Sequence, residues 1–168
     1  MRIVHCSAEI SPDLESGGPL EVNVLFTSTQ ATMAATKVAG KLAGNLGARI
    51  RIIVPQVVPF PLPLSDPPIK PEFTGNRIRA MLSQYPVDVE VCLCREKLTA
   101  PISVLKPHSL ILIGGRTRFW PTEEYRLARR LRQRGHEVVF VEQQSTSKSS
   151  KPPAVSADRS PGSRPVRS

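Results

Sequence analysis

The feature that most constrains this chain is a regular alternation of short apolar segments with segments of helical periodicity. Five apolar segments rich in β-branched residues are expected to form strands, at residues 21–27, 48–55, 87–94, 109–115 and 136–142. A helical pattern or a short helical connection occupies each interval between them. Strands joined in this way need crossover connections, which are right-handed and place helices on the faces of the sheet. The sequence therefore predicts an α/β fold with a doubly wound, mostly parallel, five-stranded sheet.

The first helical pattern, residues 29–47, carries signals at both ends. Ser28 or Thr29 can cap its N-terminus, and Gly47 can end it. Glycines within the pattern, Gly40 and Gly44, weaken it by about 1 kcal/mol each but would permit close packing on a sheet. The apolar face is expected to contain Ala31, Ala35, Val38, Leu42 and Leu46.

Three further helical segments are expected, at residues 72–85, 97–105 and 121–135. The last of them begins with Pro121 at the first helical position and ends at Gly135. Glu123 in its first turn can pair with Arg126, three residues later. The arginines of this helix are too many for one buried stripe, so we interpret most of them as a solvent-exposed face. The alternative is that they form a surface that binds an anionic partner.

Two of the expected strands have patterns that predict their place in the sheet. Residues 109–115 show no polar alternation, which is typical of a central strand covered on both faces. Residues 87–94 alternate valines with acids, which is typical of an edge strand. Cys92 and Cys94 share one face of the second segment and are interpreted as inert thiols, because the three histidines of the chain have no metal-ligand spacing.

Three regions do not follow the alternation. Residues 1–20 precede it and are interpreted as an N-terminal arm, before a domain that spans residues 21–143. Residues 55–71 contain seven prolines, which predicts an extended loop. Residues 144–168 are rich in serine, proline and basic residues and have little to bury, so we expect a disordered tail.

The charge of the chain bears on its partners and its location. The formal net charge is +9, and seven arginines fall between Arg116 and Arg134. This balance permits binding to nucleic acid or another anionic partner. The chain has no run of about 20 apolar residues that could span a membrane, and its start does not look like a secretory signal. We therefore expect a cytoplasmic protein that does not associate with membranes.

Residues 21–142 resemble the universal stress protein family. The resemblance lies in "VLFTSTQATMAATKVAGKLAGNLGARIRIIVPQV", with its helix end before an apolar strand, and in the strand and glycine turn of "LKPHSLILIGGRTR". It implies a Rossmann-like sheet with the five expected strands in the order 3-2-1-4-5. It also implies a homodimer formed through the last strand, residues 136–142, whose uninterrupted apolar residues would leave a bare sheet edge.

The motif by which members of this family bind ATP is mostly absent from this chain. Members that bind ATP carry an Asp after the first strand, where this chain has Thr27, and a G-x2-G-x9-G-[S/T] run after the fourth. The run would begin at Gly114, but its second glycine falls on Thr117 and its final pair on Leu127 and Ala128. A phosphate cradle needs glycine where the backbone approaches the oxygens. The resemblance therefore implies that ATP binding is weak or lost.

Ligands of open α/β sheets bind beyond the carboxyl ends of the strands, where the strand order reverses. The residues expected near that crevice are Thr27, Ser28, Gly114, Gly115, Arg116 and Arg118. We expect a non-catalytic binding or regulatory protein without a required cofactor. Two alternatives stay open: a basic module that binds nucleic acid or another polyanion through the arginine-rich helix and the tail, and an ATP-using enzyme of the same fold.

Overall fold

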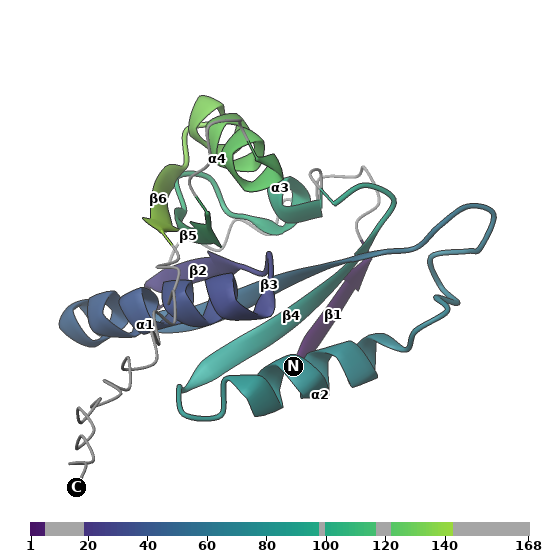
Figure 1. The fold of residues 1–168 in the computed structure, drawn as a ribbon, viewed down its shortest axis with the longest axis horizontal. Helices are drawn as coiled ribbons and strands as arrows, with labels where there is room; N and C mark the ends of the chain where they lie inside the picture. Colours follow the sequence, from purple (N-terminus) through teal and green to yellow (C-terminus); the bar gives the residue numbers. More distant parts are fainter. Residues whose placement is uncertain (6–18, 98–99, 117–121, 143–168) are drawn as a thin grey trace, which may run out of the picture.

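The computed structural model describes residues 1–5, 19–97, 100–116 and 122–142. Its strands are β1 (Arg2–His5), β2 (Glu21–Leu25), β3 (Arg49–Val57), β4 (Val87–Cys94), β5 (Leu110–Gly115) and β6 (Glu137–Glu142). They form one parallel sheet in the order β1–β4–β3–β2–β5–β6 (Figure 1). The five expected strands are β2 to β6, and their order is the predicted 3-2-1-4-5. The α/β fold and its doubly wound parallel sheet are confirmed.

The predicted number of strands was too small, because the first residues of the chain form a sixth. β1 pairs with β4 in parallel, with Ile3 opposite Val91. The expectation of an arm over residues 1–20 is therefore wrong for residues 2–5, and β4 is not an edge strand. Four residues are too few for periodicity to reveal a strand. With β1 and β3 on its two sides, β4 buries Glu90 at 4% exposure instead of leaving it in solvent.

The helices cover both faces of the sheet. They are α1 (Thr29–Leu46), α2 (Pro71–Met81), α3 (Ala100–Val104) and α4 (Glu123–Gln133). α1 and α2 pack on one face, and α3 and α4 pack on the other (Figure 1). α4 begins later than predicted, with Thr122 as its N-cap, and Pro121 lies outside the described residues. No helix in the described ranges is long and apolar enough to cross a membrane.

α1 begins and ends as predicted, and its expected apolar face is confirmed in part: Ala31 and Ala35 are buried, and Val38 and Leu42 pack half-buried against the core. Ser28 caps its N-terminus, and Gly47 ends it in the left-handed conformation at φ 62°. The buried residues are Ala31, Thr32, Ala35, Thr36, Ala39 and Ala43, whereas Leu46 is 51% exposed. Small side chains let the helix lie close to β2 and β5. The residues that face the sheet are therefore small, and the larger Leu46 is left exposed. A methyl group on Gly40 would meet the ring of Tyr85, and one on Gly44 would meet nothing within 4 Å, so the expectation that these glycines pack on the sheet was wrong.

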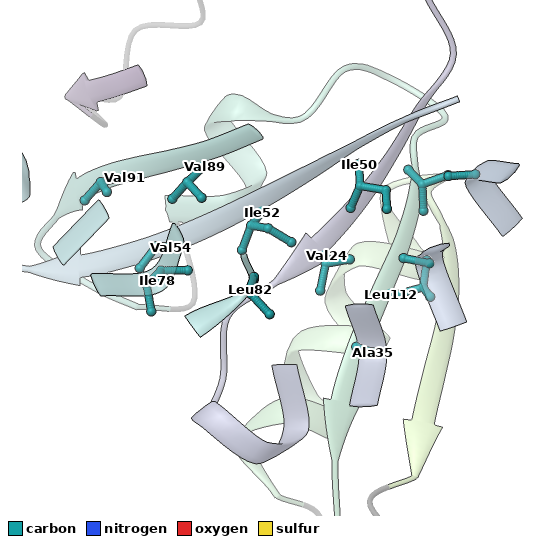
Figure 2. Packing of buried hydrophobic residues seen from close by; sticks show 13 residues of the cluster. Val24, Ala35, Ile50, Ile52, Val54, Ile78, Leu82, Val89, Val91 and Leu112 are labelled. Carbon is teal, nitrogen blue, oxygen red and sulfur yellow. The ribbon is translucent and has the colours of Figure 1, made fainter. Parts of the chain in front are cut away.

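Each face of the sheet carries its own apolar core. Figure 2 shows the core under α1 and α2, where Ile52 of β3 lies among Val24, Leu82 and Val89. The core under α3 and α4 contains Leu25, Ile53, Cys92, Cys94, Ile111, Ile113, Leu127 and Leu131. β5 contributes to both, as predicted for a central strand. These two cores fix β2 and β5 side by side at the centre of the molecule.

β3 does not end at Pro55, contrary to expectation, but continues to Val57. Along β3, alternate residues turn their backbone groups to opposite sides. Ile53 faces β2, since its carbonyl accepts from the N–H of Phe26, so Pro55 faces the same side. β2 has already ended at Leu25, and Pro55, which has no N–H, donates no further bond to that side of β3. The rest of the proline-rich segment, residues 58–70, forms no helix or strand.

Candidate functional site

The candidate site lies beyond the carboxyl ends of β2 and β5, where the strand order reverses. From this point α1 leaves towards one face of the sheet and α4 towards the other (Figure 1). A cavity of about 660 Å³ lies between the starts of the two helices. It is lined by Ser28, Thr29, Gln30, Ala31, Gly115, Arg116, Thr122 and Glu124. Of the expected residues, Ser28, Gly115 and Arg116 line this cavity, Thr27 and Gly114 lie beside it, and Arg118 is outside the described residues.

Thr27 occupies the position where the family resemblance implies an aspartate. Its Oγ1 donates to the carbonyl oxygen of Gly114 at 2.8 Å, and its backbone N–H donates to Oγ1 of Thr32 at 3.3 Å. The hydroxyl of Thr27 therefore forms a hydrogen bond between the end of β2 and the end of β5. Thr27 thus lies beside the crevice in a strand-to-strand bond and brings no negative charge to it.

The two glycines at the end of β5 have packing reasons for being glycine. A methyl group on Gly114 would overlap the backbone carbonyl of Ala31, because the first turn of α1 lies directly on this strand. A methyl group on Gly115 would lie 2.6 Å from Cζ of Phe140 in β6. Neither glycine has the positive φ of a phosphate-binding turn, a conformation that Gly47 and Gly135 do adopt. These glycines therefore let neighbours approach and do not form a backbone cradle.

The N-termini of α1 and α4 both face the cavity. Oγ of Ser28 accepts from the N–H of Ala31 at 3.3 Å, and Oγ1 of Thr122 accepts from the N–H of Tyr125 at 3.4 Å. Two helix N-termini bring partial positive charge to the same space. Arg116 is exposed at its rim, whereas Glu124 is half-buried, with its Cβ 3.4 Å from where a methyl group on Gly115 would stand. This combination suits a small anion and disfavours a ligand with several negative charges.

Sequence reasoning missed the contribution of the helix starts. Thr29, Gln30, Thr122 and Glu124 all line the cavity and were not among the expected site residues. The signal was present, because a helix that follows a parallel strand begins at that strand's carboxyl end. The strand order therefore already implies that the first turns of α1 and α4, which follow β2 and β5, lie at the crevice.

Other groups that could carry chemistry lie away from this cavity. Cys92 and Cys94 are buried in the core under α3 and α4, and no group of three His, Cys, Asp or Glu residues in the described ranges could hold a metal ion. His136 precedes β6, at the opposite end of the sheet. Burial lowers the pKa of His136, and the positive charges of His108 and Arg134 lower it further. The neutral form of this histidine is thus favoured in the folded protein.

The chain has no match among models of known protein families or among curated proteins. Among solved structures, it is similar to a universal stress protein crystallised in complex with cAMP. The TM-score is 0.45 and the sequence identity is 15%, over 75% of this chain and 98% of that protein's chain.

Proposed function

We propose that this chain is a non-catalytic binding protein of the universal stress type that holds a small anionic ligand in the crevice and binds ATP weakly or not at all. The observation that carries the proposal is the cavity at the point where the strand order reverses, with Arg116 at its rim and two helix N-termini facing it. Its volume of about 660 Å³ is in the range of small-molecule sites.

The side chains favour an anion with one acidic group over a triphosphate. A guanidinium and nearby helix N–H groups can hold a single phosphate or carboxylate. A chain of phosphates would need further positive charge or a glycine-lined backbone, and the half-buried carboxylate of Glu124 would repel it. Since Gly114 and Gly115 serve packing, the backbone at the end of β5 offers no such cradle.

Calorimetry with ATP and with monophosphate probes tests this proposal. We expect no micromolar binding of ATP, and binding of AMP or cyclic AMP that Arg116→Gln weakens about tenfold, as the loss of one charge-assisted contact implies. Arg77→Gln is the matched control, because Arg77 is an exposed arginine on α2, on the other face of the sheet. Mass spectrometry of the purified chain would identify any ligand that it retains.

Micromolar ATP binding would contradict the proposal. So would monophosphate binding that responds equally to Arg116→Gln and Arg77→Gln, because the ligand would then not be in the crevice.

A further inference from the structure

The outward face of α4 carries arginines that the crevice does not use. Leu127, Ala128 and Leu131 pack against the sheet, so the helical period turns the opposite side of α4 to solvent. Figure 1 shows α4 on the outside of the sheet, on the face away from α1 and α2. The exposed residues that we call the basic face are Tyr125, Arg126, Arg129, Arg130 and Arg134.

The positive charges of the basic face are not neutralised within the described molecule. None of its four arginines forms an ion pair with a described residue, and the predicted pair between Glu123 and Arg126 is not formed. By contrast, Arg132 of the same helix donates to the carbonyl oxygen of Val138 at 2.9 Å. The basic face thus presents unpaired guanidinium groups to solvent.

The stability of the helix accounts for only part of this arrangement, since Arg130 lies in the last turn, where the helix dipole favours cations, and Arg126 does not. Arg126 and Arg130 are four residues apart within α4, where like charges repel and destabilise a helix, and Arg134 follows at the C-cap. The helix dipole favours cations in the last turn only, whereas Arg126 lies near the positive end of α4. An anionic partner would turn this repulsion into a favourable interaction.

The neighbouring turn extends the positive surface beyond the end of α4. Nδ1 of His108 lies 3.2 Å from the carbonyl oxygen of Gly135, which places the turn before β5 beside the end of the helix. Lys106 in this turn is exposed and adds a further positive charge. The positive surface therefore extends from Arg126 to Arg134, about 12 Å at 1.5 Å per residue, and continues past the end of α4 to Lys106.

Tyr125 indicates which kind of anion fits this surface. Its side chain is 53% exposed and lies four residues before Arg129, on the same side of the helix. Arginines that contact phosphates beside an aromatic ring that stacks on a base are the combination by which proteins bind single strands. A membrane surface fits less well, because the apolar side of α4 is buried and no apolar face is left to enter lipid. We propose that the basic face binds single-stranded nucleic acid, with its arginines on the phosphates and Tyr125 stacked on a base.

Fluorescence anisotropy of the full chain with labelled single-stranded RNA and DNA 20-mers tests this proposal. We expect the logarithm of the association constant to fall with the logarithm of salt concentration with a slope of about −3, for four phosphate contacts on a single strand. Arg126→Gln with Arg129→Gln should weaken binding at least tenfold and reduce the slope by about 1.4. Tyr125→Ala should weaken binding about tenfold, whereas Tyr125→Phe should retain it, because the ring and not the hydroxyl stacks.

The matched control is Arg77→Gln with Arg79→Gln, which removes two exposed arginines from α2 on the other face of the sheet. This control should bind as the native chain does, and the melting temperature of every variant should stay within a few degrees of the native value. Unchanged binding after the substitutions in α4 would overturn the proposal, because another basic part of the chain would then be responsible. Equal affinity for polyglutamate, for vesicles that contain phosphatidylserine, or for duplex DNA at the same salt would overturn the assignment to single strands.

Discussion

Single residues at the end of β5 show how one sequence signal supports two interpretations. Adjacent glycines after an apolar strand are compatible with a phosphate cradle and with close packing, and the sequence alone does not distinguish these two interpretations. The structure favours close packing, because the carbonyl of Ala31 occupies the space that a side chain on Gly114 would need and the ring of Phe140 occupies the space beside Gly115. The location of the crevice could be predicted from the strand order, whereas the roles of Thr27 and Gly114 depend on contacts between residues far apart in the chain.

Gly114→Ala is expected to destabilise the protein by at least about 2 kcal/mol, since the added methyl group meets backbone that cannot rotate away. Gly44→Ala is the matched control, because its methyl group, in the last turn of α1, would meet nothing within 4 Å. The control should stabilise the protein by about 1 kcal/mol. Urea denaturation measures both changes, and a Gly114→Ala variant as stable as the native chain would show that α1 does not rest on this strand.

At the scale of elements, the sequence pattern predicted every helix and five of the six strands in the part of the chain that the structure describes. The pattern failed to predict the burial of a residue where that burial depends on which elements pack beside its strand. Glu90 was expected on the exposed side of an edge strand, but β1 covers that edge and the chain buries Glu90 against Arg51 of β3. Nε of Arg51 lies 3.1 Å from Oε2 of Glu90 and Nη2 lies 2.6 Å from Oε1, and both Nη atoms lie 3.3 Å from the carbonyl oxygen of Val104. The pair thus ties β3 and β4 to the end of α3.

Breaking this buried pair from one side is expected to cost more than removing it whole. Arg51→Met alone leaves Glu90 buried without its partner, a loss of about 3–5 kcal/mol, whereas Glu90→Leu alone leaves Arg51 with only the carboxylate of Glu21, 3.9 Å away. The double variant, Arg51→Met with Glu90→Leu, removes both charges and should be more stable than either single variant. A double-mutant cycle from urea denaturation measures the coupling. Additive losses would show that the two side chains act independently.

At the scale of the whole molecule, the sheet has two edges of different character. At one edge, β1 covers β4. At the other edge, β6 pairs with β5 alone among the described strands. The N–H of Glu137 donates to the carbonyl oxygen of Ser109, so Glu137 faces β5. Val138 and Phe140 therefore turn their backbone groups outward. Arg132 already donates to the outward carbonyl of Val138, a contact that partly blocks this edge. The predicted tail, residues 144–168, lies outside the described residues.

Assembly through β6 remains a prediction, and Arg132 offers a way to test it. If two copies pair their β6 strands, the carbonyl of Val138 must exchange the guanidinium of Arg132 for a backbone N–H. Arg132→Ala should therefore tighten the dimer, whereas Arg129→Ala, which removes an exposed arginine without this contact, should leave it unchanged. Light scattering over a range of concentrations measures both. A native chain and an Arg132→Ala variant that are both monomeric at about 100 μM would refute a dimer of ordinary affinity.

The pairing of β1 with β4 also has a consequence for how the protein is made. Ile3 pairs with Val91, about 90 residues later in the chain, so this contact has a high contact order. At 5–20 residues per second, the ribosome needs roughly 5 to 18 s to synthesise that interval. During this time β1 has no strand to pair with, and the centre of the sheet can begin to assemble only as β3 joins β2. The segment synthesised ahead of the other described strands therefore cannot dock before β4, and the nascent chain carries it unpaired until β4 has emerged.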